Sequence, residues 1–511
     1  MNYEQLALKR RLEMCINRND TGFFGVFGPG GTGKTYTVTR ILGVDKFLFL
    51  APTNKAANEV NKNLTNSGIK NKCITIDRYL GYSKEKDEYN KDLIKYTPIE
   101  KLEIPKVIVI DEVSMMNDEH VRMFAEISKK AFIILMGDVM QIPPVRPNDK
   151  KTYNKEGFEV SKIFNEIHDF FNLTVQNRQD PNSRLFKMIN HFRSIMNEKI
   201  NFQQFALKYI NSNDIINFDI HSDKLNEYIL NHRPICVSYT NLTSNFFNYK
   251  ISKVLNPHEK TNQITVGSTY YFKKSCITKE KVFYTSELVT VYKIKLVKKD
   301  IIIPVFNKKL EFEYNEIDVL FLTDKTIHKI YLPNEDARQK IYSFINYRIK
   351  NYPLTNDEKA KIFTWYEKYK NSFACLSMTH AMTAHKSQGS TFENVLVPIY
   401  DFADYNGDYK YFNQLFYTAI SRAKEKIIFV TGLSNFNDTS KRPPQWTHEE
   451  KKYILEEIDY KCFSCQKIFE HHRDFEIHHI IPLNAGGNNQ PENLRPLCKE
   501  CHKLIHKNET T

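Results

Sequence analysis

One stretch of the sequence has the residue types and spacing that bind a nucleotide phosphate. It runs from Gly28 to Thr35 and fits the pattern G-x-x-x-x-G-K-[ST] without a mismatch. Its glycines let the backbone turn tightly, so that N–H groups face a phosphate, while its lysine reaches the terminal phosphates and its final threonine holds Mg²⁺. The residues expected to contact ATP are Gly28, Gly30, Gly31, Thr32, Gly33, Lys34 and Thr35. A glycine-rich turn without a ligand is the alternative, and motifs further along the chain weigh against it.

The elements around this loop predict a parallel α/β sheet. Residues 22–27 are apolar enough for a buried strand, and residues 34–42 are able to form a helix. The other strand candidates of this half are residues 46–51, 107–110 and 131–136. Strands that alternate with helices give a parallel sheet, whose ligands bind at the carboxyl ends of its strands. Thr53, Asn54 and Lys55 follow the second strand, so we expect them to contact a ligand beside the nucleotide.

Two carboxylates follow the apolar run at 107–110. Asp111 is placed to hold Mg²⁺ through water, and Glu112 to orient the water that attacks the γ-phosphate. An acidic strand end without a catalytic role is the alternative. Gln141 follows the next strand and precedes a rigid Pro-Pro turn, which suits a sensor of the γ-phosphate.

Two further residues are open to two interpretations. Arg178 is either an arginine finger, which neutralises charge in phosphoryl transfer, or an ordinary surface arginine. Gln5 lies about two dozen residues before the phosphate loop, where its amide could read an adenine edge. Without a related family, a surface residue is the simpler interpretation of Gln5.

Composition limits the classes of function. The formal net charge is +13, and residues 441–511 contain 11 basic and 11 acidic side chains, so the excess lies in residues 1–440. A basic excess of this size favours a polyanion partner such as nucleic acid. The sequence has no apolar run of about 18 residues and no apolar leader, so we expect neither a membrane span nor secretion.

The series of motifs resembles superfamily 1 helicases, with the RecD/Dda group (superfamily 1B) as the nearest likeness. Residues 28–35, 51–58, 111–115 and 137–144 are similar to that family's motifs I, Ia, II and III in order and spacing. The resemblance implies two RecA-like domains, residues 1–180 and 181–432. It places Gln5 at the adenine of ATP, and Arg178 as a finger.

The second half carries matching motifs. The segment ending in Thr240 resembles the family's Tyr-Thr-Asn motif, and residues 378–391, with His385 and Lys386, resemble motif V, which contacts nucleotide and DNA backbone. Arg422 matches the arginine of motif VI, a second finger. Residues 262–335 are rich in short β-forming runs, which predicts the small inserted β-barrel that the family uses against single-stranded DNA.

The resemblance implies an ATP-dependent DNA helicase that moves 5′ to 3′ on single-stranded DNA and opens forked duplexes. We expect a monomer, with replication or recombination proteins as candidate partners. Residues 81–104 are a small insertion from which a strand-separating pin would come. An intracellular location, in cytoplasm or nucleus, is expected, with a viral or mobile-element origin as one alternative. A motor that acts on RNA is the alternative to one that acts on DNA.

The last part of the chain predicts a metal-stabilised module. Residues 433–447 are polar and contain Pro-Pro, which is typical of a linker. Residues 448–511 are too few to bury a stable hydrophobic core without a disulfide or a structural metal ion. Two C-x-x-C pairs supply ligands for a structural Zn²⁺. These cysteines are Cys462, Cys465, Cys498 and Cys501.

The same tail resembles an HNH (ββα-metal) endonuclease over nearly its whole length. By that match His479 is the general base and Asn493 orients it, while a catalytic divalent ion, Mg²⁺ or Mn²⁺, is held by histidines. The ligands implied are His478 and His502, with His506 one helical turn further on. Aspartate is common in this family at the position of His478, and imidazole also suits Zn²⁺ or Ni²⁺, so the identity of the catalytic ion stays open. A zinc-binding tail that only grips DNA is the alternative.

Overall fold

The computed structural model describes most of the chain, and we treat it in two compact units. The residues outside the description are 87–91, 144–159, 211, 221, 258–263, 279–281, 284–286, 304, 307, 322–324, 334–340, 342–343, 346, 350–351, 353, 403–408, 432–461, 463–464, 466, 470–473, 480–493 and 503–511. One unit comprises Met1–His258 and His380–Thr511, and the other comprises Glu259–Thr379.

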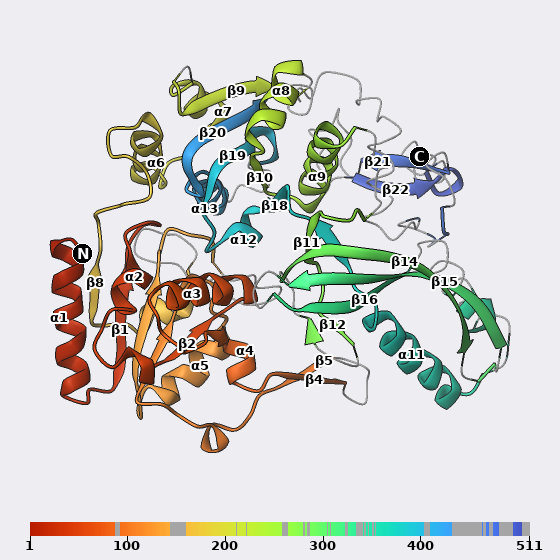
Figure 1. Ribbon diagram of the computed structural model, residues 1–511, viewed down its shortest axis with the longest axis horizontal. Helices are drawn as coiled ribbons and strands as arrows, with labels where there is room; N and C mark the ends of the chain where they lie inside the picture. The colour runs from red at the N-terminus through yellow and green to blue at the C-terminus, as the bar shows by residue number, and fades with distance from the viewer. Residues whose placement is uncertain are drawn as a thin grey trace, which may run out of the picture. The chain divides into compact units, whose positions relative to one another are not determined.

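The first sheet has six parallel strands in the order β3-β2-β6-β7-β1-β8. Figure 1 labels β1, β2 and β8 of this sheet. Its strands are β1 (Gly22–Phe27), β2 (Leu48–Ala51), β3 (Ile74–Thr75), β6 (Val107–Ile110), β7 (Phe132–Gly137) and β8 (Phe170–Asn172). Every residue of β6 and β7 is buried, because helices cover both faces of the sheet. The apolar runs predicted as strands are therefore confirmed.

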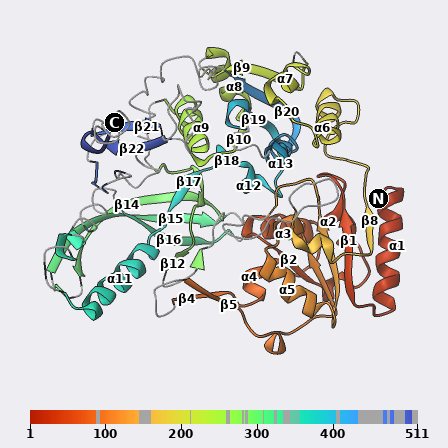
Figure 2. The same ribbon diagram turned by 180° about the vertical axis from the view of Figure 1, so that it is seen from behind.

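Five helices belong to this sheet. They are α1 (Tyr3–Asn17), α2 (Lys34–Val38), α3 (Asn54–Asn66), α4 (Ile76–Tyr79) and α5 (Asp118–Ile127). Helix α1 begins with a capping box, in which Asn2 accepts from the Gln5 backbone N–H and the Gln5 side chain accepts from the Asn2 N–H. From both sides the model shows α1 beside β1 and β8, at one edge of the sheet (Figure 2). Gln5 is thereby placed at the start of α1, on the side of the phosphate loop.

The expected insertion at 81–104 contains an antiparallel hairpin, β4 (Ser83–Lys86) and β5 (Asp92–Lys95). The rings of Tyr82 and Tyr96 lie at the base of this hairpin with centroids 5.6 Å apart. The chain then returns to the sheet at β6.

The second sheet has five parallel strands in the order β18-β10-β19-β20-β9. Its strands are β9 (Ile215–Asp219), β10 (Ile235–Ser238), β18 (Ala381–Thr383), β19 (Phe392–Pro398) and β20 (Ala423–Thr431). The helices are α6 (Arg184–Ser194), α7 (Phe202–Leu207), α8 (Asp223–His232), α9 (Asn241–Leu255), α12 (Ala384–Ser387) and α13 (Tyr409–Ile420). Phe416 of α13 stacks on Phe202 at 4.4 Å and lies 5.2 Å from Phe192 of α6, so these helices share one core.

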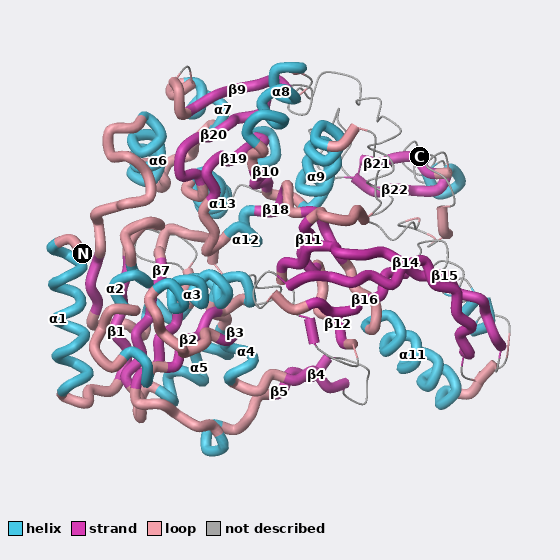
Figure 3. The backbone as a smooth tube through the Cα atoms, viewed as in Figure 1, coloured by secondary structure: helices cyan, strands magenta, loops and turns pink. Residues whose placement is uncertain are grey.

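The second unit is a β-rich insertion, as expected, but its strands are longer than the short ones predicted. Its antiparallel sheet has the order β16-β15-β14-β11-β17, and the tube view shows β14 and β15 as one long hairpin (Figure 3). The elements are β11 (Thr269–Phe272), β12 (Cys276–Ile277), β13 (Val282–Phe283), β14 (Leu288–Ile303), β15 (Lys308–Phe321), β16 (Ile327–Pro333), α11 (Asn356–Asn371) and β17 (Leu376–Met378). Because β17 pairs with β11, the unit extends to Thr379 rather than ending at residue 335.

The described part of the tail is a small antiparallel pair, β21 (Phe475–His479) and β22 (Leu494–Cys498). Phe469, Phe475 and Leu497 form its apolar core together with three of the cysteines. The predicted linker at 433–447 lies outside the described residues. Among the helices that the structure describes, none is both long and apolar enough to cross a bilayer.

Ile134→Ala tests the packing of the first sheet. Ile134 is fully buried in β7 between Phe24 of β1 and Val109 of β6. Truncation should lower the free energy of unfolding by roughly 2–5 kcal/mol, because it removes buried apolar contacts and leaves a cavity. Urea denaturation followed by circular dichroism measures this loss. Leu42→Ala is the control, since Leu42 is 76% exposed and should change stability by no more than about 0.5 kcal/mol. Equal effects of the two changes would contradict the assigned core.

Candidate nucleotide and metal sites

The phosphate loop joins β1 to α2 in a conformation that requires glycine. Gly28, Gly31 and Gly33 have φ angles of +151°, +87° and +81°. A Cβ atom on Gly28 would lie 2.1 Å from the carbonyl oxygen of Leu173, which is closer than any side chain tolerates. The tight turn predicted for this motif is therefore present.

Lys34 is turned onto its own loop. Its Nζ donates to the carbonyl oxygens of Gly28 at 2.8 Å and Pro29 at 3.1 Å. Burial lowers the pKa of Lys34, and the carboxylates of Asp138 and Glu112 oppose that shift. The ammonium group is thus held among acceptors that a phosphate would replace.

The two carboxylates after β6 face the same loop. Thr35 Oγ1 donates to Asp111 Oδ2 at 2.9 Å, so the two residues predicted to hold Mg²⁺ are brought together. Burial raises the pKa of both Asp111 and Glu112. Glu112 also has a φ angle of +52°, a conformation that side chains rarely adopt and that is often found at functional sites.

Gln141 is 4% exposed in the turn after β7. Its backbone N–H donates to the carbonyl oxygen of Asp138 at 3.1 Å, and its own carbonyl oxygen accepts from Gln414 Nε2 at 3.1 Å. Its side-chain Oε1 is buried with no hydrogen-bond partner among the described residues. An amide left in this state is ready for a ligand.

Arg178 lies between the phosphate loop and the second sheet. Its Nη1 donates to the carbonyl oxygen of Ser421 at 2.7 Å, and a Cβ atom on Gly30 would lie 2.7 Å from the same nitrogen. Burial, and after it the charge of Arg422, lowers the pKa of Arg178 to about 10. Arg178 is therefore a half-buried arginine that contacts the loop, and not an ordinary surface residue.

Arg422 follows α13 and is 1% exposed. Its guanidinium donates to the Thr418 and Ser390 carbonyl oxygens at 2.9 and 3.4 Å and to Ser421 Oγ at 3.0 Å. Burial lowers the pKa of Arg422, and the carboxylate of Glu112 opposes the shift. The two arginines, from motifs more than two hundred residues apart, are thus brought to the carboxylates of the first sheet.

Gln5 is buried against the phosphate loop. Its Nε2 donates to the Thr32 carbonyl oxygen at 3.0 Å, and it is 4% exposed, so the surface-residue interpretation is wrong. It borders a hollow of about 410 Å³. The lining residues are Met1, Asn2, Gln5, Gly31, Gly33, Tyr36 and Asn177.

The residues predicted to contact DNA occupy several places. Thr53 and Thr240 cap α3 and α9, and Thr240 also donates to the buried carboxylate of Asp401 at 2.9 Å. Asn54 is the first residue of α3. Burial lowers the pKa of His385 to about 4, which makes it a neutral side chain at neutral pH.

Of two further features near these residues, the first involves Lys55, which the sequence placed beside the nucleotide, and the second was missed by sequence reasoning. Lys55 Nζ donates to the carbonyl oxygen of Lys386 at 2.6 Å, which joins α3 to α12. Burial, and then the charge of Arg422, lowers the pKa of Lys55 to about 7. Asp138 and Arg193 form a buried ion pair at 2.8 Å. No local pattern distinguishes Arg193, because its partner lies 55 residues earlier in the chain.

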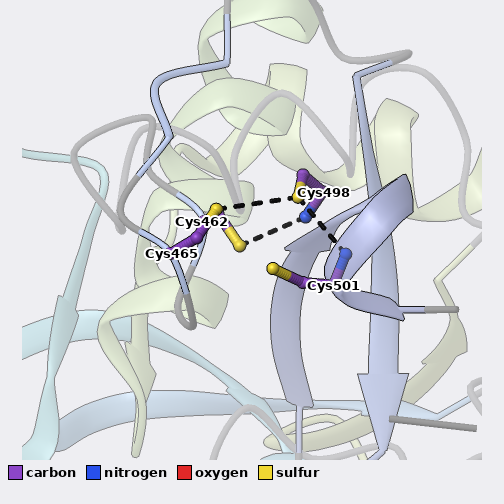
Figure 4. Close-up of side chains that lie close together, drawn as sticks. All are labelled: Cys462, Cys465, Cys498 and Cys501. Atoms are coloured by element: carbon purple, nitrogen blue, oxygen red, sulfur yellow. Dashed lines mark hydrogen bonds between the residues drawn. The ribbon is translucent and has the colours of Figure 1, made fainter. Parts of the chain in front are cut away.

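The four tail cysteines converge (Figure 4). Their sulfur atoms all lie within 4.8 Å of one another, and the Cys498 and Cys501 N–H groups donate to Cys462 and Cys498 sulfurs at 3.3 and 3.4 Å. Four thiolates held about 2.3 Å from one Zn²⁺ lie at comparable separations. The donor set and its spacing therefore fit a structural zinc ion.

The histidines of the tail are only partly placed. His478 and His479 are at the end of β21, and the backbone register pairs them with Arg495 and Leu494. His502 Nδ1 lies 2.7 Å from Glu476 Oε2. Asn493 and His506 lie outside the described residues, so the catalytic set stays a prediction.

Three protein families match parts of the chain. An AAA domain matches residues 14–147, a UvrD-like helicase C-terminal domain matches residues 378–430, and an HNH endonuclease matches residues 462–508. These three matches coincide with the first sheet, the end of the second sheet and the cysteine-containing tail.

Similar proteins match either most of the chain or a short segment of it. An uncharacterized protein of Acanthamoeba polyphaga mimivirus is 24% identical over 513 residues, which cover 84% of this chain and 99% of that protein. The restriction enzyme EcoKMcrA of Escherichia coli is 33% identical over 61 residues, 11% of this chain and 22% of that enzyme. Anaredoxin of Nostoc is 31% identical over 71 residues, 14% of this chain and 88% of that protein, so this segment belongs to the same family as Anaredoxin.

The Pif1 helicase of Candida albicans is a structural neighbour with a TM-score of 0.47 and 16% identity, over 90% of this chain and 99% of that one. The matched helicase families, together with motifs I to VI in order and the two parallel sheets that carry them, identify the motor part. The chain therefore carries an AAA domain and a UvrD-like helicase C-terminal domain, the two parts of a helicase motor, and an HNH endonuclease domain at residues 462–508.

Proposed function

We propose that the chain hydrolyses ATP to move 5′ to 3′ along single-stranded DNA and to separate forked duplexes, and that its tail hydrolyses DNA phosphodiesters. One observation carries the motor half of this proposal. Lys34, Asp111 and Glu112 of the first sheet are half-buried near Arg178 and Arg422, which contact the segment 418–421 before β20. Charges of this number and type suit a nucleotide triphosphate.

Lys34 and Thr35 bind the nucleotide in this mechanism. Lys34 exchanges the carbonyl oxygens of Gly28 and Pro29 for the β- and γ-phosphates. Thr35 and Asp111, whose Oγ1 and Oδ2 atoms are 2.9 Å apart, would hold Mg²⁺, which would neutralise phosphate charge. Gln5 and the hollow beside it receive the adenine.

Glu112 acts on the attacking water. Its raised pKa, caused by burial, favours acceptance of a proton as the water attacks the γ-phosphate. Gln141 offers its unpartnered Oε1 as a second ligand for that water. Arg178 and Arg422 stabilise the charge on the transferring phosphate, a contribution that reaches about 10³–10⁵ in rate in related chemistry.

DNA is the proposed track. The basic excess of residues 1–440 favours a polyanion, and Thr53, Asn54, Thr240, His385 and Lys386 are its proposed contacts. Each base-pair step costs about 1.4 kcal/mol to unstack, so strand separation needs coupling to ATP. The hairpin β4–β5 is the proposed pin.

The tail is proposed to cut DNA. Cys462, Cys465, Cys498 and Cys501 hold a structural Zn²⁺, which lets so short a segment fold. His479 removes a proton from water and Asn493 orients His479. The proposed ligands of the divalent ion are His478, His502 and His506. The ion would neutralise the scissile phosphate. The match of residues 462–508 to HNH endonucleases supports this assignment.

Lys34→Ala should abolish ATP hydrolysis that is stimulated by single-stranded DNA, because the variant lacks the ammonium group proposed to bind the β- and γ-phosphates. A coupled phosphate-release assay measures this, and the zinc content of the variant should equal that of the wild type. Cys498→Ser is the matched control, since it should release zinc and leave the ATPase unchanged. Equal stimulation of the wild-type ATPase by RNA would argue against DNA as the track.

His479→Ala should abolish cleavage of supercoiled circular DNA in Mg²⁺ or Mn²⁺, because the water loses its general base. Agarose-gel assays with and without ATP measure this and show whether translocation licenses cutting. His471→Ala, which changes a histidine outside the proposed set, is the control. Cleavage that persists in His479→Ala would sink the nuclease assignment. No cleavage by the wild type with any divalent ion would favour a tail that only binds DNA.

A further inference from the structure

A buried ion pair connects the two parallel sheets beside the proposed ATP site. Arg193 Nη1 and Nη2 donate to Asp138 Oδ2 and Oδ1 at 2.8 and 2.9 Å, a two-pronged contact that fixes both side chains. Arg193 Nη1 also donates to Tyr417 Oη at 2.6 Å. The Tyr417 hydroxyl in turn donates to Asp138 Oδ2 at 3.3 Å. Three chain segments therefore meet in one network.

The network is too buried to be a simple source of stability. Asp138 and Tyr417 are each 1% exposed, and the Arg193 side chain is 21% exposed. The free energy needed to remove the two charges from water is about as large as the free energy gained from their attraction. Apolar side chains of equal volume would therefore hold the sheets together equally well. Burial raises the pKa of Asp138, but the Arg193 guanidinium more than compensates and holds that pKa below its usual range. The carboxylate therefore stays charged, which favours a role that needs this charge.

Asp138 organises the turn that presents Gln141. Its side chain accepts from the Met140 N–H at 3.1 Å, and its carbonyl oxygen accepts from the Gln141 N–H at 3.1 Å. The same carboxylate acts electrostatically on Lys34 of the phosphate loop. The first-sheet side of the network thus includes both residues proposed to meet the terminal phosphate.

Tyr417 lies on α13, close to the second arginine. Arg422 Nε donates to the carbonyl oxygen of Thr418, the residue after Tyr417, at 2.9 Å. Arg193 itself is anchored in the core of the second sheet, because Phe192 beside it on α6 packs on Phe416 of α13. Arg193 therefore stands between the turn 138–141 and the helix that leads to Arg422.

We propose that Arg193 is a positioning residue that couples phosphate binding at the first sheet to the placement of Arg422 by the second sheet. Bound phosphates would engage Lys34, which leaves the negative charge of Asp138 to Arg193. The bridge would then hold the turn 138–141 and α13 in the arrangement that places Arg422 at the transferring phosphate. This inference rests on the proposed ATP hydrolysis at the same site.

Arg193→Gln in the full chain tests the coupling. It should lower kcat for ATP hydrolysis at saturating single-stranded DNA by about 10-fold or more, within the range of about 5–150-fold typical of coupling between sites. KM for ATP should change by less than about 3-fold, because Arg193 does not touch the nucleotide. The kcat of Arg193→Lys should lie between those of the wild type and Arg193→Gln, since lysine keeps the charge and loses the two-pronged contact. The kcat of Asp138→Asn should equal that of Arg193→Gln. The kcat of the double variant should be no lower than that of either single variant.

Arg184→Gln is the matched control. Arg184 also lies on α6, is exposed, and donates to the Lys208 carbonyl oxygen at 2.9 Å. The kcat of Arg184→Gln should therefore equal that of the wild type. A kcat of Arg193→Gln equal to wild type, or losses that add in the double variant, would overturn the inference. If Arg193→Gln does not fold, as judged by its melting midpoint, Arg193→Lys and Tyr417→Phe decide, and wild-type kcat in both would overturn it. Absence of ATP hydrolysis by the wild type would instead remove the proposed function.

Discussion

The structure depends on buried and half-buried charged side chains that lie between two parallel sheets and balance one another only in part. The first sheet contributes Lys34, Asp111, Glu112 and Asp138, and the other side contributes Arg178, Arg193 and Arg422. Burial alone would neutralise such groups, and the shifted pKa values of the carboxylates and lysines record that cost. Proteins retain isolated buried charges at functional sites, where a ligand supplies the remaining counter-charge. A polyphosphate with its metal ion suits this set.

Parallel strands explain why these charges meet. Strands β1, β6 and β7 are neighbours in the first sheet, and their carboxyl ends deliver the phosphate loop, Asp111 with Glu112, and Asp138 with Gln141 to one edge. Continuous apolar runs marked these strands in the sequence, because a strand buried on both faces has no polar alternation. The phosphate-loop motif and the acidic strand end were therefore predictable from local patterns.

Contacts made across long sequence separations were not predictable in the same way. Gln5 is an unremarkable glutamine until α1 is docked beside the loop, and Arg193 has no motif of its own. The lengths of β14 and β15 also escaped prediction, since hairpin pairing rather than local composition sets where a strand ends. In the tail, spacing identified the cysteine cluster, because two C-x-x-C pairs impose a ligand geometry by themselves.

Separation of a forked duplex is the measurement that tests the central claim most directly. The wild-type chain would be mixed with forks that carry a single-stranded tail at either the 5′ or the 3′ end of the strand on which it loads, with ATP, with ADP or with a non-hydrolysable analogue. A fluorophore and quencher across the duplex report strand separation. The account predicts that strands separate with ATP but not with ADP or the analogue, and only on the fork whose loading strand has a 5′ tail. Separation that is independent of nucleotide, or none with any fork, would contradict a motor driven by the buried charges between the two sheets.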